Sequence, residues 1–419
     1  MNDKILWIWL SLVCTPGNET FAKLISKFET PENVYSAEEY EISSAIGSKS
    51  RDFSAIKRKD VSSAERIYEY CVKKNVGILT YSDEKFPKAL REISNPPVLL
   101  YYRGVLPNFN ELFCVSIVGT RRLSEYGRKN ALEISSDLAT AGATVVSGMA
   151  LGVDGVAHAG ALNAGGITIA FLGSGIDVCY PIEHKPLARE IVKTGCVFTE
   201  YAPGTKPEKV NFPRRNRLIS GISEATLVIE GRERSGALST ARYAKKQNKP
   251  VYALPGNVGN PNSQLTNLLI KNGAKLFTAA DDIIRDYQDI CLGKLNPFLL
   301  QERTRINEYE VLKKYAVAAL TSNDRIFRHS RKKDNEKQYK NETYAPEENL
   351  PTSQAQREPV NFDSETLKLY KKIPPNAECS IESLVDSEFT LRKIMKGLLK
   401  LEMGSFIVML PGEKVKRNF

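Results

Sequence analysis

The chain has 419 residues, of which 42% are hydrophobic, so it is long enough to form two or three domains with apolar cores. Its formal net charge of +10 suits a polyanionic partner, although a basic protein without such a partner explains the charge equally well. Seven cysteines without a C-x-x-C pair and only three histidines argue against a zinc site or a disulfide framework, and for a reducing, cytoplasmic compartment. No segment is apolar for long enough to predict a membrane span, so we expect no membrane partner.

Residues 1–75 predict a small helical domain, similar to SAM or helix-hairpin-helix modules. The apolar segment 5–14 is interpreted as a buried helix rather than a signal peptide, because only Lys4 supplies a nearby positive charge and no A-x-A cleavage site follows. A second helix is indicated by apolar residues at helical spacing, namely Phe21, Leu24, Ile25 and Phe28. The SSAIGSKS segment could contact DNA, but a plain helical bundle accounts for it better.

Residues 76–289 predict a Rossmann-like α/β core. Short apolar runs alternate with helical segments, and these runs span 115–119, 144–148, 168–173, 196–201, 226–231 and 250–256. Strands that alternate with helices form βαβ units, so we expect a doubly wound, mostly parallel sheet. Such sheets bind ligands beyond the carboxyl ends of their strands, where the strand order reverses.

The last part of the chain predicts a linker and a small domain. Residues 290–360 are charged and poor in large apolar side chains, which is typical of a flexible linker. Residues 361–419 predict two or three helices followed by a hairpin, as in a winged-helix-like domain. Ten basic and eight acidic residues nearly cancel there, which argues against a strong DNA-reading helix.

The segment VGTRR places Gly119, Thr120, Arg121 and Arg122 where a strand ends and a helix begins. Free backbone N–H groups and the helix dipole favour an anion at such a corner, and two arginines can add bidentate phosphate contacts. The segment is not G-x-G-x-x-G, which argues against a dinucleotide-dependent oxidoreductase. We therefore interpret this corner as a candidate phosphate site.

Two further corners are expected at the same edge of the sheet. Ser147 and Gly148 end one strand, and Ser235 and Gly236 precede a helix. After the first of these corners, Asp154 and His158 lie four residues apart on one helical face. They could form an acid–base pair, but a helix-capping aspartate and a packed histidine explain them better.

The segment from Lys206 to Arg217 is the most informative one, with five basic residues, one acidic residue and an aromatic residue between them. Single strands require positive charge for the backbone and a flat side chain for a base. We expect Arg214 and Arg217 to share a helix face and Arg215 to point elsewhere. The alternative is an ordinary surface helix with Phe212 in the core. The candidate DNA-binding residues here are Lys209, Phe212, Arg214, Arg215, Asn216 and Arg217.

The ordered set of motifs resembles the DNA-processing protein A family (DprA, also called Smf) over about residues 76–289. The set comprises VGTRR, SGMALGVDGVAHAGAL, FLGSGIDVCYP, NFPRRNRLISG, SGALSTARYA, VYALPGN and LTNLLIKNGA. The resemblance implies a Rossmann-like protein that binds single-stranded DNA, forms a homodimer and loads RecA recombinase during natural transformation. It implies no catalytic residue, metal or cofactor.

Within that resemblance, Arg121 or Arg122 would contact phosphate, and Lys209 with Phe212 would match the family's basic-x-x-Phe element. This chain departs from the family pattern at Leu151 and Gln264, where positive charge is lost. An alternative is a nucleotide or nucleoside hydrolase on a related core. Such enzymes carry a P-G-G-x-G-T turn with a downstream catalytic glutamate, whereas this chain has GRERSGALST and no such glutamate. We therefore favour a DNA-binding protein that is not an enzyme.

Overall fold

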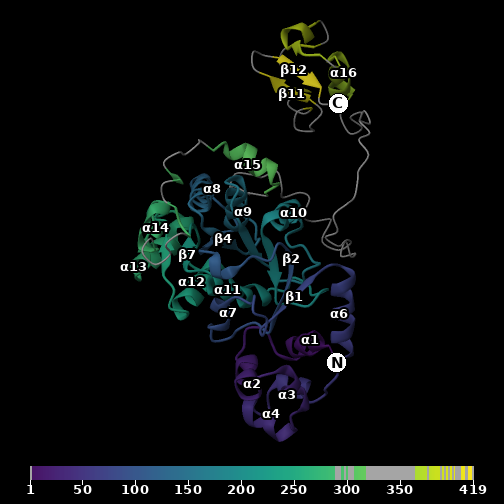
Figure 1. Ribbon diagram of the computed structural model, residues 1–419. Helices are drawn as coiled ribbons and strands as arrows, with labels where there is room; N and C mark the ends of the chain where they lie inside the picture. The colour runs from purple at the N-terminus through teal and green to yellow at the C-terminus, as the bar shows by residue number, and fades with distance from the viewer. Residues whose placement is uncertain are drawn as a thin grey trace. The chain divides into compact units, whose positions relative to one another are not determined.

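The computed structural model describes residues 2–287, 294–296, 299–300, 306–317, 364–374, 377–386, 389–390, 393–394, 397–398, 401, 407–410 and 414–417. The chain divides into two compact units, Met1–Ala345 and Pro346–Phe419 (Figure 1). The predicted boundary at residue 75 falls inside the first unit. It stays a prediction.

Six helices form the N-terminal part, as the sequence predicts, and gather beside β1 and β2 (Figure 1). The first helix, α1, is amphipathic only weakly, because its residues Leu6 to Leu10 are all buried. Trp9 packs edge-on against Tyr35, with ring centroids 5.1 Å apart. The prediction of a buried N-terminal helix is thus confirmed. The six helices are α1 (Asp3–Val13), α2 (Thr20–Phe28), α3 (Pro31–Ser36), α4 (Glu39–Ile46), α5 (Arg51–Ile56) and α6 (Ser62–Lys73).

A nine-stranded sheet runs through the first unit in the order β1-β2-β6-β5-β4-β3-β7-β8-β9. The seven strands from β6 to β9 in this order are mutually parallel, and the order reverses at β3. The predicted doubly wound α/β fold is therefore confirmed. The strands are β1 (Gly77–Thr80), β2 (Leu99–Gly104), β3 (Cys114–Val118), β4 (Thr144–Ser147), β5 (Thr168–Phe171), β6 (Cys196–Thr199), β7 (Ala225–Val228), β8 (Val251–Ala253) and β9 (Lys275–Leu276).

Helices cover both faces of the parallel sheet. Side chains alternate between the two faces along each strand, so each strand contributes to both cores. In β3, Val115 and Ile117 join the core beneath α8, α9 and α10, whereas Cys114 and Val118 join the core beneath α11 and α12. The helices of this region are α7 (Lys88–Arg91), α8 (Glu125–Thr140), α9 (Val153–Asn163), α10 (Lys185–Thr194), α11 (Asn211–Ile222), α12 (Ala237–Lys246), α13 (Gln264–Lys271) and α14 (Ala280–Tyr287).

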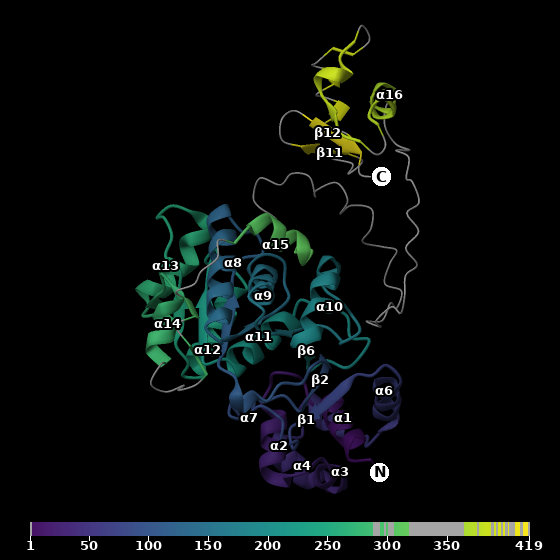
Figure 2. The ribbon, with the colours of Figure 1, turned by 45° about the horizontal axis from the view of Figure 1, so that its top comes forward.

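Part of the predicted linker is helical, which corrects the expectation of a flexible segment there. Helix α15 (Glu308–Lys314) lies over α8 and α9 (Figure 2). Val311, Tyr315 and Val317 are buried in the main core, and Glu308 forms an ion pair with Arg128. The apolar residues at helical spacing thus fold this part of the segment into a packed helix, although the residues around them are mostly charged. Most of the remaining predicted linker lies outside the described residues.

The second unit contains helix α16 (Ser364–Lys372) and a three-stranded antiparallel sheet in the order β10-β12-β11. Its strands are β10 (Cys379–Ser380), β11 (Ile407–Leu410) and β12 (Lys414–Arg417). Helix α16 and the β11–β12 pair agree with the predicted helices followed by a hairpin. Much of the segment between residues 387 and 406 lies outside the described residues, so the winged-helix-like assignment stays a prediction.

Replacing Leu10 by alanine should lower the free energy of unfolding by about 2–5 kcal/mol, because the side chain is fully buried in the core shared by α1 and the sheet. Leu12→Ala, on the same helix but 41% exposed, is the matched control and should change stability by less than about 0.5 kcal/mol. Urea unfolding measures both. Equal effects of the two variants would contradict this packing.

Candidate nucleic-acid interface

The structure brings the corners selected from the sequence to one edge of the sheet, at the carboxyl ends of β3, β4, β5 and β7. The strand order reverses here, because β4, β5 and β6 lie on one side of β3 and β7 lies on the other. The corner after β3 is closely packed, since a Cβ on Gly119 would lie only 2.4 Å from Cγ2 of Val153. Glycine is therefore required where the chain leaves β3.

Arg121 and Arg122 are both exposed at this corner. The backbone N–H of Arg122 donates to Oγ1 of Thr120 at 3.1 Å, which folds the turn and occupies the threonine hydroxyl. Among the described residues, neither guanidinium has a carboxylate within ion-pair distance. Both side chains are consequently available to an anion.

Phe212 lies beside Arg121, although the two residues belong to different loops. The guanidinium of Arg121 is 5.5 Å from the centroid of the Phe212 ring, within cation–π range. The ring is partly exposed and packs over Gly173, where a Cβ would lie 2.9 Å from its Cδ1. Tyr180, which the sequence analysis did not select, is 38% exposed, and its ring centroid is 5.5 Å from that of Phe212. An arginine and two aromatic rings thus form one cluster.

Arg215 points into the protein instead of toward a ligand, which corrects its selection as a DNA-contacting residue. Its side chain is 3% exposed and donates to the carbonyls of Gly148 (2.7 Å) and Phe171, at the ends of β4 and β5. Burial lowers the pKa of Arg215 to about 10, which leaves it charged at neutral pH. Gly148 is required beneath it, because a Cβ there would lie 2.5 Å from the guanidinium. Arg215 therefore joins α11 to two strand ends.

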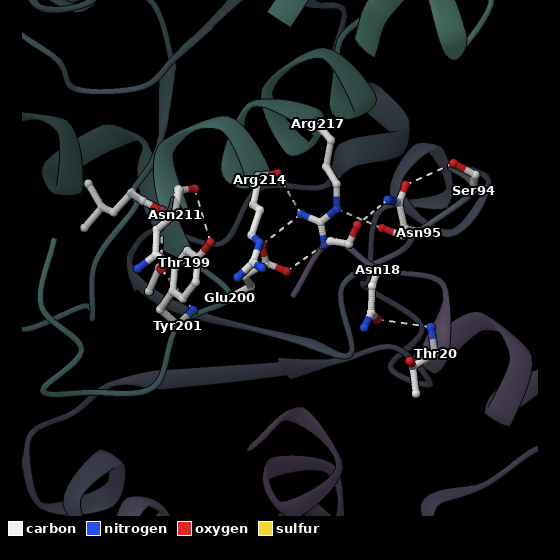
Figure 3. Close-up of polar contacts among 12 residues, drawn as sticks. Asn18, Thr20, Ser94, Asn95, Thr199, Glu200, Tyr201, Asn211, Arg214 and Arg217 are labelled. Atoms are coloured by element: carbon white, nitrogen blue, oxygen red, sulfur yellow. Dashed lines mark hydrogen bonds and ion pairs between the residues drawn. The ribbon is translucent and has the colours of Figure 1, made fainter. Parts of the chain in front are cut away.

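Arg217 is also buried, which corrects its selection as a DNA-contacting residue. The expected shared face with Arg214 is confirmed, because both side chains approach Gly17. Its guanidinium forms a bidentate ion pair with Glu200, at 2.8 and 2.6 Å (Figure 3). Its Nε donates to the carbonyl of Asn95 at 2.9 Å, and the Asn95 amide donates to the carbonyl of Gly17 at 2.6 Å. Arg217 thus connects α11 to the loop between the first two N-terminal helices.

Two other selected residues bond within the protein. Ser147 is fully buried, and its hydroxyl donates to the carbonyl of Ile117 at 2.6 Å. Asn216 is 9% exposed, and its amide donates to Oγ of Ser239 at 2.7 Å. Ser147 therefore supports the strand ends, and Asn216 joins α11 to α12.

Lys209 and Arg214 flank Phe212 at the start of α11. Lys209 is exposed, whereas Arg214 is partly buried next to Gly17. On the other side of β3, Gly236 is exposed, while the hydroxyl of Ser235 is enclosed and has no hydrogen-bond partner among the described residues. Of the fourteen residues selected, four are exposed, namely Arg121, Arg122, Lys209 and Gly236. Five more are partly exposed, namely Gly119, Thr120, Phe212, Arg214 and Ser235.

Asp154 and His158 do not form an acid–base pair. The carboxylate of Asp154 accepts the backbone N–H groups of Gly148 (3.2 Å) and Ala150 (3.3 Å), and burial raises its pKa. His158 is fully buried with Nδ1 2.7 Å from the hydroxyl of Thr168, and burial lowers its pKa to about 3. The prediction of a packed histidine is confirmed, whereas the prediction of a helix-capping aspartate is wrong, because Asp154 bonds to the loop before α9 and the N-cap is Gly152.

Residues 77–288 match the model of a family described as DNA recombination-mediator protein A. The chain belongs to this family. It is 35% identical to Protein Smf of Synechocystis sp. over 68% of this chain and 72% of that relative. It is 34% identical to DNA processing protein DprA of Bacillus subtilis over 53% of this chain and 75% of that relative. The predicted resemblance is confirmed.

A solved structure supports the same family assignment. The X-ray structure of DNA processing protein A from Streptococcus pneumoniae aligns with a TM-score of 0.60 and 31% identity, over 68% of this chain and 98% of that chain. Within the part of the family member that the structure describes, no helix is long and apolar enough to cross a membrane. The same residues contain no cluster of His, Cys, Asp and Glu side chains arranged for a metal ion.

Arg217→Ala should lower the free energy of unfolding by about 3–5 kcal/mol, because it leaves the buried Glu200 carboxylate without its partner. Arg214→Ala, three residues earlier on α11, is the control and should be much milder, since Arg214 is partly exposed. Thermal and urea unfolding compare the two. An Arg217→Ala protein of unchanged stability would rule out the structural role assigned here.

Because His158 is buried, the free energy of unfolding should fall as the pH drops from about 6.5 toward about 5, where 6.5 is the usual pKa of an unfolded histidine. The unfolded imidazole of His158 gains a proton in this range, whereas the native one gains it only near pH 3, so protonation favours the unfolded state. The contribution of His158 is therefore complete above pH 6.5 and lost progressively below it. His158→Asn should flatten the pH dependence of the unfolding free energy in this window, and an unchanged slope would contradict the assignment.

Proposed function

We propose that the protein binds single-stranded DNA at the carboxyl edge of its parallel sheet. The observation that carries this proposal is the cluster of Arg121, Phe212 and Tyr180. The partly exposed rings offer flat apolar faces to a base, and the guanidinium beside them can neutralise the neighbouring phosphate. Lys209 and Arg122 add exposed positive charge around the rings. Because every base has a π-face, such a site accepts single strands without strong sequence preference.

We further propose that the bound strand is protected and passed to RecA recombinase in homologous recombination and natural transformation. The family description, a recombination mediator, supports this role. We infer a homodimer in the cytoplasm. The free cysteines among the described residues support a reducing compartment, because paired cysteines predominate in oxidising ones.

We propose that the protein is not a hydrolase or another enzyme. A hydrolase at this edge would need an acid or base enclosed beside its substrate, whereas Glu233, an exposed carboxylate of this edge, lies on a surface turn. The buried carboxylates there are already engaged: Asp154 accepts two backbone N–H groups, and Glu230 accepts the backbone N–H and the hydroxyl of Ser124. These bonds support a role for both in holding the loops.

Phe212→Ala should weaken the binding of a single-stranded oligothymidylate about fivefold or more, because stacking on one base contributes roughly 1–3 kcal/mol. The slope of log affinity against log salt should stay nearly unchanged. Arg121→Ala should instead flatten that slope by about 0.7, the value for one neutralised phosphate on a single strand. Fluorescence anisotropy at several salt concentrations measures both quantities.

Lys246→Ala, in the last turn of α12, removes one exposed charge far along the helix from the edge and should leave affinity and slope unchanged. A duplex of equal length should bind more weakly than the single strand. The proposal fails if the wild-type protein prefers duplex DNA. It also fails if Phe212→Ala loses stability by several kcal/mol, as a core residue would, while Arg121→Ala binds normally.

A further inference from the structure

The loop after β7, residues 231–236, lies directly beside the corner that carries Arg121 and Arg122. The backbone N–H of Ile229 donates to the carbonyl of Val118 at 3.1 Å, so the two chain segments leave the sheet side by side. The Asn262 amide donates to the carbonyl of Arg122 (3.0 Å) and to the Glu230 carboxylate (3.3 Å). The loops on both sides of the strand-order reversal are therefore fixed against each other.

This loop, GRERSG, presents two arginines that the sequence analysis did not select. Arg232 and Arg234 are both exposed, and among the described residues neither has a carboxylate within ion-pair distance. The backbone N–H of Ser235 donates to the carbonyl of Arg232 at 2.9 Å, which folds the loop into a turn. Glu233 is exposed between the arginines and offsets part of their charge. Exposed arginines on a turn at a sheet edge suit the phosphates of an extended polyanion.

The two basic corners are separated by a distance that a short length of DNA can span. Phe212 packs over Gly173, just beyond β5, and three strand spacings of about 4.8 Å separate β5 from β7, or roughly 14 Å. A single base stacked on Phe212 cannot cover this span, whereas a few linked nucleotides can. Arg121 and Arg122, at the end of β3, lie between the two ends of such a path.

We propose that single-stranded DNA continues from the Phe212 ring across the strand-order reversal, and that Arg232 and Arg234 form a second phosphate-binding subsite. This inference rests on the proposed function, because it extends the same DNA path. The subsite recognises the phosphodiester backbone, since it offers two cations and no aromatic side chain. Its contribution therefore depends on the length of the oligonucleotide and on salt, and it is independent of base identity.

The test compares Arg232→Ala/Arg234→Ala with the wild-type protein on fluorescent oligothymidylates of stepwise increasing length. On the shortest oligonucleotides that bind, the double variant should match the wild type, because only the Phe212 region is occupied. On longer ones it should bind more weakly, and its salt slope should be flatter by about 1.4, the value for two phosphate contacts on a single strand. Lys245→Ala/Lys246→Ala, at the far end of α12, removes the same charge and is the matched control.

Glu233→Gln gives an independent test, because its expected effect on affinity is opposite to that of the arginine variant. Removing this negative charge from the loop should strengthen the binding of long oligonucleotides and leave that of short ones unchanged, if the backbone passes over the loop. Both variants alter exposed side chains of a turn, so their thermal unfolding should match that of the wild type.

The outcomes separate this inference from the proposed function. The second subsite alone is refuted if Arg232→Ala/Arg234→Ala binds every length of oligonucleotide as the lysine control does. This outcome presupposes that the wild type binds single strands and that Phe212→Ala binds them more weakly. If the affinity of the arginine variant falls by the same factor for short and long oligonucleotides, the loop belongs to the Phe212 site and a separate subsite is refuted. A wild-type protein that binds no single strand overturns both.

Discussion

Helix α11 is held against the sheet by the buried guanidinium of Arg215, which donates to carbonyls at the ends of β4 and β5. These carbonyl dipoles, together with the charge of Asp154, stabilise a cation that has lost nearly all of its water. Phe212 precedes Arg215 by three residues and therefore lies on the same face of the helix, where its ring is 6.0 Å from the guanidinium. The position of the exposed ring thus depends on a cation that is itself enclosed by the protein.

The same helix also anchors the N-terminal part of the chain. Arg217 lies two residues beyond Arg215, so its guanidinium points in another direction, toward Glu200 and the Asn95 carbonyl. The Asn95 amide in turn donates to the carbonyl of Gly17. Because α11 carries both contacts, this one helix sets the orientation of the N-terminal helices and that of the Phe212 ring. Removing one partner of such a buried ion pair is strongly destabilising, because the other charge is left buried without compensation.

The sequence was sufficient to predict most of the sheet, because six of the seven parallel strands are short apolar runs that end at glycine or a polar corner. The seventh, β9, is an exposed Lys275–Leu276 pair and was not predicted. It did not predict β1 and β2 as antiparallel additions, since the segment between them contains loops and the short helix α7. The clustered arginines of α11 were misjudged for a physical reason. A basic residue in a sequence shows its charge but not its partner, and the partners of Arg215 are backbone carbonyls. Glu200 followed a fully buried strand, and that position was the available sign of a buried ion pair.

Burial also changes what the net charge of the chain means for binding. The salt dependence of DNA affinity reflects only the cations that displace counterions from phosphates. Arg215 and Arg217 have exchanged water for carbonyls and a carboxylate, so they attract no phosphate, although they account for two of the five basic residues between Lys206 and Arg217. Their role is to orient Phe212 and to fix the helix. Under the proposed function, the attraction to phosphate must come from exposed side chains on the surrounding loops. The basic segment then has two separable effects, because its buried arginines fix the position of Phe212 and its exposed cations attract the DNA backbone.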